Sequence, residues 1–193
     1  METLPEIETE RLLLRTLVPA DAPALFGYAV DPRVSRFLLW SPHKDIEESR
    51  AAIDRFREAP QMMQWAITQK DGGVLVGVGG FGVVNGALRS ADLGYSFSPA
   101  FWGQGFATEM TKAVISHGFL EMGLFRIQGA IHPENAASGR VLEKSGLTYE
   151  ATLRSWMVID GQPIDTMIYA ITSADFETRQ TSNSAKSAGK ACR

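Results

Sequence analysis

The sequence has almost no cysteine and no long apolar run, and each absence excludes a class of protein. Its only cysteine is Cys192, in a chain of 193 residues. A disulfide framework within the chain is therefore excluded, as is a metal site built from several cysteines. No stretch approaches the ~18 apolar residues of a membrane-spanning helix. The first ten residues hold acidic side chains where a signal peptide needs a basic and then apolar start. We expect a cytoplasmic protein with no membrane partner.

A strong charge of either sign is also lacking, because 19 lysines and arginines stand against 22 acidic residues, a net charge of −3. Nothing in this balance favours a nucleic-acid partner. A chain of this length buries roughly 70% of its unfolded surface on folding, so it does not need disulfides or a structural metal ion for stability. We predict a single domain over residues 1–176, as a monomer or homodimer, and a polar, disordered tail over residues 177–193.

Hydrophobic periodicity and turn residues predict a mixed α+β chain in which most neighbouring strands are antiparallel. Asp71-Gly72-Gly73, Asn85-Gly86 and Asp160-Gly161 are turn formers between strand-like segments. Strands are expected at 10–18, 64–69, 74–84, 89–97, 125–131, 149–159 and 164–171, and helices at 22–29, 45–59, 105–122 and 136–144.

The most informative segment is a glycine-containing turn between a strand and a helix, with the sequence FWGQGFATE from Phe101 to Glu109. A helix start has unpaired N–H groups and a partial positive charge. A glycine-lined turn at such a start is therefore suited to a pyrophosphate. We predict that main-chain amides between Gly103 and Thr108 bind one.

A second glycine-rich segment, Gly77 to Gly82, matches the G-x-G-x-x-G dinucleotide pattern. That pattern must open a helix within a βαβ unit. Here Val83-Val84-Asn85-Gly86 follows, which is the end of a strand and a turn. We therefore interpret Gly77 to Gly82 as part of a strand with close neighbours or a bulge.

Several segments, in this order, resemble the GNAT superfamily of acyltransferases, and more narrowly its RimJ/RimL-like branch of N-acetyltransferases. They are ETERLLLR (8–15), LGY (93–95), WGQGFATE (102–109), NAAS (135–138), VLEKSG (141–146) and DTMIY (165–169). The resemblance covers residues 8 to about 172. It implies the GNAT fold, with about four helices and a mostly antiparallel seven-stranded sheet that splays between strands 4 and 5.

The resemblance implies acetyl-CoA as co-substrate and no metal. In the family the turn reads R/Q-x-x-G-x-G/A; here Trp102, which we expect to be a packing residue, stands first, and Gly105 and Ala107 hold the other places. Gly94 suits a bulge at the splay. The residues expected to bind the cofactor are Tyr95, Phe97, Gly103, Gln104, Gly105, Phe106, Ala107, Thr108 and Asn135.

The candidate catalytic residues are Ser138, Asp92 and Glu150. Many relatives place a tyrosine that acts as general acid where this chain has Leu142. Ser138 is the branch's alternative proton donor. It also suits a first-turn hydroxyl that bonds to its own backbone. Asn135 suits both an N-cap and a cofactor contact. Asp92 and Glu150 are candidate bases, or else solvated or salt-bridged carboxylates. The histidines His43, His117 and His132 show no metal or triad spacing.

The predicted reaction is direct acetyl transfer to an amine, without a covalent enzyme intermediate. A peptide α-amine, with a pKa of about 7.7–8.0, is far easier to deprotonate than a lysine amine at about 10.4. With no unmistakable base, the chain favours a protein N-terminal α-amine, as in ribosomal-protein acetylation. The alternatives are a small amine (an aminoglycoside or polyamine) and a non-catalytic acyl-CoA-binding module. Acceptor specificity is expected in residues 37–40 and 156–165.

Overall fold

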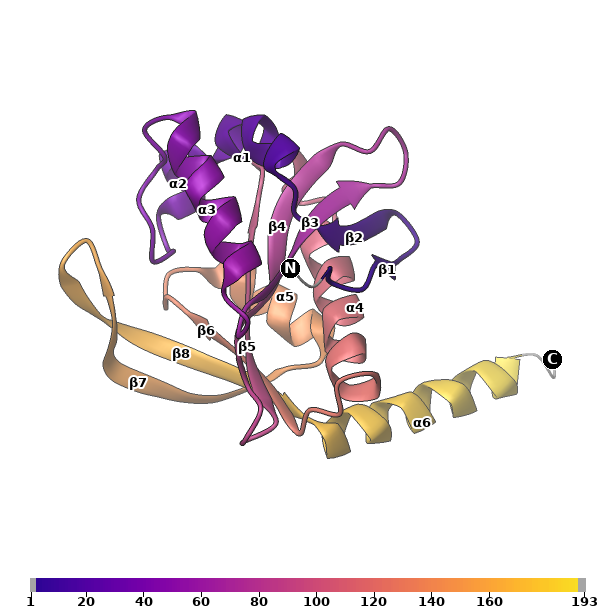
Figure 1. Cartoon of the computed structure of the whole chain (residues 1–193). Coiled ribbons are helices and arrows are strands. Elements are labelled where there is room, and N and C mark those ends of the chain that lie inside the picture. Colours follow the sequence, from indigo (N-terminus) through magenta and orange to yellow (C-terminus); the bar gives the residue numbers. More distant parts are fainter. Residues whose placement is uncertain (1–2, 191–193) are drawn as a thin grey trace.

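The computed structural model describes residues 3–190, with side chains through residue 181. Eight strands form one sheet in the order β1-β2-β3-β4-β5-β6-β8-β7 (Figure 1). Among the described strands, only β5 and β6 are parallel neighbours. The strands are β1 (Ile7–Glu8), β2 (Leu12–Thr16), β3 (Met63–Gln69), β4 (Leu75–Asn85), β5 (Ser90–Phe97), β6 (Arg126–Ile131), β7 (Thr148–Ile159) and β8 (Gln162–Thr172).

Helices cover both faces of this sheet. The α-helices are α1 (Ala22–Ala29), α2 (Pro32–Ser35), α3 (Ile46–Glu58), α4 (Phe106–Leu120), α5 (Ala136–Ser145) and α6 (Ser173–Lys190). One core cluster includes Met110 and Ile115 of α4 with the strands beneath them, and a second includes Leu25 of α1 and Ile53 of α3. The mixed α+β fold and its mostly antiparallel sheet are as predicted.

The strand β1 and the helices α2 and α6 go beyond the expected seven strands and about four helices. The two short elements are β1 and α2. The strand β1 has two residues and pairs with β2 through Ile7 opposite Leu14. Asp31 caps the one-turn helix α2 by accepting a hydrogen bond from the Arg33 N–H at 2.9 Å. Neither element has enough residues to show a hydrophobic period.

The helix α6 stands where the sequence predicted a disordered tail. Its start is anchored, because Phe176 packs on Phe119 of α4 with ring centroids 5.1 Å apart. The Asp175 carboxylate also accepts hydrogen bonds from the Thr172 N–H and hydroxyl, at 3.0 and 2.6 Å. The segment 177–190 contains no proline to stop the helix. The last three residues of the predicted tail, 191–193, lie outside the described residues.

The sheet opens between β5 and β6. These are the fourth and fifth of the seven expected strands, because β1 was not expected, so the opening lies where the family resemblance implied. The two strands pair at Ser90, Ala91 and Asp92 only, and the last pair is Asp92 with Gln128. From Leu93 onward, the edge of β5 that faces β6 has no strand partner. This opening connects the two faces of the sheet.

The bulge predicted at Gly94 lies instead in the neighbouring strand. Gly94 pairs regularly with Gly80, whereas the register of β4 shifts between Phe81 and Val83. Gly82 is the extra residue, and it fits because a Cβ there would approach only the Asp92 carbonyl oxygen, at 3.8 Å. The run from Gly77 to Gly82 is therefore strand throughout, which excludes a dinucleotide-binding turn at this position.

Candidate active site

The glycine turn is exposed and ends where α4 begins. Gly103 and Gly105 have φ angles of 75° and 84°, in the left-handed region that favours glycine. Gly105 is the N-cap of α4, and no side chain caps the helix start. The main-chain N–H groups of the first turn are therefore left for an anion, as the pyrophosphate prediction requires.

Side chains around the turn fix its shape rather than cover it. The Gln104 side chain donates to the Ala100 carbonyl at 2.9 Å. Phe106 is buried in the core, so only its backbone is available to a cofactor. Trp102 donates from its indole nitrogen to the Phe97 carbonyl at 2.8 Å and so ties the turn to β5. Trp102 is 47% exposed, so its shown role is this hydrogen bond, and the packing role that the sequence suggested stays a prediction.

Arg11, which the sequence analysis gave no role, lies just before β2 and braces the turn. Its guanidinium donates to the Gln104 carbonyl at 3.0 Å and to a Glu109 carboxylate oxygen at 2.7 Å, and it lies 4.5 Å above the centre of the Phe106 ring. Burial would raise the pKa of Glu109, but hydrogen bonds from Thr9 and Arg11 outweigh it and hold that pKa below its ordinary value. Arg11 and Glu109 are 98 residues apart, which is why no local pattern showed the pair.

Replacing Arg11 should loosen the turn. We expect Arg11→Ala to weaken acetyl-CoA binding roughly tenfold, about 1.4 kcal/mol, because the Gln104 carbonyl loses a charged donor. Calorimetric titration with acetyl-CoA measures the change. Arg50→Ala is the matched control, since Arg50 pairs only with Glu47 one turn away on α3. Equal affinities in the two variants would contradict the bracing role.

The unpaired edge of β5 contributes backbone and one buried hydroxyl to the opening. Phe97 is 5% exposed and belongs to the core, so its expected cofactor contact is limited to backbone. Its carbonyl already accepts from Trp102. The Tyr95 hydroxyl oxygen is inaccessible to solvent and has no hydrogen-bond partner among the described residues. A buried donor without a partner fits a site that binds a polar group such as a thioester.

On the other side of the opening, α5 places Asn135 and Ser138 at its start. The Asn135 side chain accepts from the Ser138 N–H at 3.1 Å, so Asn135 is an N-cap. Its contact with a cofactor stays a prediction. Leu142, one turn further, is 2% exposed and offers no polar group. Ser138 thus carries the hydroxyl of the first turn of α5, and its role as proton donor stays a prediction.

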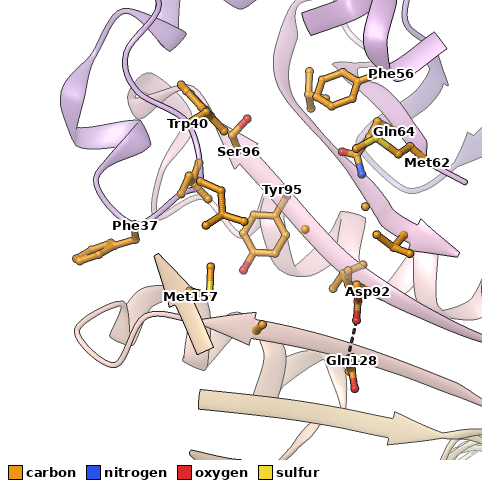
Figure 2. A pocket seen from close by; sticks show the side chains of 18 of the residues that line it. Phe37, Trp40, Phe56, Met62, Gln64, Asp92, Tyr95, Ser96, Gln128 and Met157 are labelled. Carbon is orange, nitrogen blue, oxygen red and sulfur yellow. Dashed lines mark hydrogen bonds between the residues drawn. The ribbon is translucent and has the colours of Figure 1, made fainter. Parts of the chain in front are cut away.

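A cavity of about 820 Å³ lies on the α1–α3 side of the opening (Figure 2). Its wall includes Tyr95 and Ser96 of β5, and it reaches the expected specificity segments through Phe37, Trp40 and Met157 (Figure 2). The lining is predominantly apolar. The cavity is the natural place for an acceptor amine, which must meet the acetyl group at the opening.

Both candidate bases line this cavity, and both are already engaged. Asp92 accepts from the Gln128 side chain at 2.7 Å, the bond drawn in Figure 2. Glu150 forms a two-point ion pair with Arg126, at 2.6 and 3.0 Å. The Arg126 hydrogen bonds hold the pKa of Glu150 below its ordinary value, so this carboxylate is a weaker base than a free one. For Glu150, the arrangement present is thus the salt-bridged carboxylate that the sequence left open as an alternative to a base.

The histidines have structural neighbours. His43 lines the cavity and contacts the Ser49 hydroxyl at 2.7 Å, and burial lowers its pKa. His132 packs on the Phe37 ring at 4.9 Å, and His117 meets the Trp65 ring edge-on at 5.9 Å. Within residues 3–190, no cluster of histidine, cysteine and acidic side chains suits a metal ion. In the same range, no helix has the length and apolar character to cross a membrane.

A sheet opened between two parallel strands, with a glycine turn at the start of the following helix, defines an acyltransferase-type fold. The acetyltransferase (GNAT) domain family matches residues 11–148, and the chain belongs to this family. The chain is accordingly an N-acetyltransferase, with relatives consistent with the RimJ/RimL-like branch. The family uses acetyl-CoA as acetyl donor and acts on amine acceptors.

Two relatives and one solved structure are similar to the chain. The chain is 35% identical to the uncharacterized N-acetyltransferase YoaA of Bacillus subtilis, over 86% of this chain and 96% of YoaA. It is 27% identical to the [ribosomal protein uS5]-alanine N-acetyltransferase of Escherichia coli, over 88% and 92% of the two chains. The spermidine N-acetyltransferase of Vibrio cholerae, solved with CoA and spermine, superposes with a TM-score of 0.76 at 18% identity, over 87% of this chain and 99% of that one. This last similarity shows the fold alone.

Proposed function

We propose that the chain transfers the acetyl group of acetyl-CoA to an amine of low pKa, with a protein N-terminal α-amine as the leading acceptor. The observation that carries the proposal is the state of the two carboxylates at the opening. Asp92 is hydrogen-bonded to Gln128, and Glu150 is neutralised by Arg126. Glu150 is therefore a weaker base than a free carboxylate, and the Asp92 carboxylate already accepts a hydrogen bond. An amine that is partly neutral at pH 7 does not need a strong base.

The charge of the cavity also argues against a polyamine. Among the described residues that line it, the carboxylates are Asp92 and Glu150, and the cationic side chains Arg55 and Arg126 lie in the same wall. A polyamine carries several positive charges, and each would require an anionic partner on leaving water. One amine on a largely apolar body fits this lining better. The similarity to a ribosomal-protein alanine acetyltransferase supports the same acceptor class.

An acceptor screen tests the proposal. Free thiol released from acetyl-CoA is measured with four acceptors: a lysine-free peptide with a free N-terminus, the same peptide N-acetylated with one lysine added, spermidine, and an aminoglycoside. The difference of about 2.5 pKa units between α-amine and lysine amounts to about 3.4 kcal/mol. We therefore expect kcat/KM for the first peptide to exceed that for the second by roughly 300-fold. A higher kcat/KM for spermidine or the aminoglycoside than for any N-terminal peptide would contradict the proposal.

A further inference from the structure

The Tyr95 hydroxyl stands out among the polar groups of the molecule. Its oxygen is buried and lacks a hydrogen-bond partner among the described residues. Such a group costs stability unless something compensates for it. The ring is fixed in place, since it meets the Phe97 ring at a centroid distance of 5.9 Å and its Cβ packs against Gly79.

The hydroxyl lies where the sheet opens. Tyr95 is three residues beyond Asp92, the last residue of β5 that pairs with β6. Its ring points away from β5 toward the strand that carries Gln128 (Figure 2). Burial raises the pKa of Tyr95, and a weak hydrogen-bond interaction with Ser138 at the start of α5 lowers it in part, although the two groups fall outside standard hydrogen-bonding geometry. The Tyr95 hydroxyl thus lies beside the start of α5.

We propose that Tyr95 is a catalytic residue, whose hydroxyl donates a hydrogen bond to the sulfur of coenzyme A as that sulfur leaves. Leu142 has no polar group to do so from α5. The inference rests on the acetyl transfer of the family and does not depend on which amine accepts. In the step assisted, the amine nitrogen bonds to the acyl carbon and the carbon–sulfur bond breaks. The electron pair of the carbon–sulfur bond stays on sulfur, and the nitrogen releases one proton to water.

Tyr95 stabilises the thiolate and keeps its own proton. Burial raises the pKa of Tyr95 to about 12, whereas a thiol has a pKa near 8.5. Complete transfer of the tyrosine proton to sulfur is therefore unfavourable, and a hydrogen bond in a water-poor site is the contribution left. Consequently, the rate should not fall with increasing pH through deprotonation of Tyr95 in the range where the protein is stable.

The test compares Tyr95→Phe with Tyr149→Phe, a tyrosine that is 50% exposed and bonded to Thr152. The first readout needs no acceptor and no turnover. Coenzyme A bound to each protein is titrated, and its thiolate is followed by ultraviolet absorbance. We expect the thiol pKa of bound coenzyme A to be about one unit higher in Tyr95→Phe than in the wild type or in Tyr149→Phe. An unchanged thiol pKa would overturn the proposal.

Two further measurements separate this role from a structural one. Because the hydroxyl has no partner, the Tyr95→Phe protein without ligand should melt at the wild-type temperature or a few degrees above it. With any amine that reacts, kcat should fall by roughly 10–100-fold, while the KM for acetyl-CoA stays within about threefold. A lower melting temperature together with unchanged kcat would assign Tyr95 to packing. Failure of the α-amine proposal would appear in the acceptor screen alone, leaving the thiol titration unaffected.

Discussion

Substitution Gly105→Trp should abolish measurable acetyl-CoA binding, with affinity reduced at least ~100-fold, about 2.7 kcal/mol. Gly105 ends the glycine turn that we predict to bind pyrophosphate, and it has a φ of 84°. A residue with a Cβ pays about 1–2 kcal/mol to hold that angle, and the indole would cover main-chain N–H groups at the start of α4. Calorimetric titration with acetyl-CoA, and with coenzyme A alone, measures the loss.

The control for this variant is Gly161→Trp in the turn between β7 and β8. Gly161 has a φ of 74° and, like Gly105, is in exposed surroundings, with nothing within 4 Å of a Cβ built on it. Both variants carry the same backbone penalty, so their melting temperatures should fall by similar amounts. Only Gly105→Trp should lose the cofactor. Wild-type affinity in Gly105→Trp would show that the turn does not bind the pyrophosphate, and the positions of Gly103 to Thr108 would need another explanation.

The parts of the fold that sequence reasoning found are those with a local signal. The helix α1 has the bounds expected for it, because Pro19-Ala20-Asp21 opens it and its apolar residues have helical spacing. The turn at Gly103 and Gly105 was found for a similar reason, since glycine at a strand-to-helix junction reports the backbone angles directly.

The parts that were missed depend on tertiary contacts. The two residues of β1 are a strand only because β2 lies beside them. The bulge lies at Gly82 rather than Gly94 because of how β4 and β5 align, and a single strand does not encode that register. The helix α6 starts on a contact with Phe119, a residue more than fifty positions earlier.

The candidate site divides in the same way. Asn135 was recognised as a helix cap because a cap acts within three residues. The pairing of Glu150 with Arg126 joins β7 to β6, and the bracing of Gln104 by Arg11 joins the turn to the segment just before β2. Such contacts decide how basic or how rigid a group is, and they follow from the assembled sheet. The residues of a site are thus easier to predict than their chemical state.

Substitution Gly80→Ala should destabilise the fold more than any other single methyl addition in β4. A Cβ at Gly80 would lie 2.1 Å from the Met63 carbonyl oxygen and 2.5 Å from the Trp65 ring, and the φ of 151° is one that side chains rarely adopt. Trp65 is fully buried and so cannot move aside. Overpacking costs about 1–3 kcal/mol and a strained backbone about as much again, so we expect a loss of roughly 3–5 kcal/mol.

Gly82→Ala in the same strand is the matched control, because its nearest neighbour would be the Asp92 carbonyl oxygen at an ordinary 3.8 Å. Urea unfolding followed by circular dichroism should show a clear decrease in the midpoint for Gly80→Ala and a shift within ~1 kcal/mol for Gly82→Ala. A wild-type midpoint for Gly80→Ala would mean that β3 and β4 do not approach as closely as described. With the expected result, Gly80 is explained by the close approach of its backbone to Met63 and Trp65, and the match of this strand to a nucleotide-binding pattern is a coincidence of spacing.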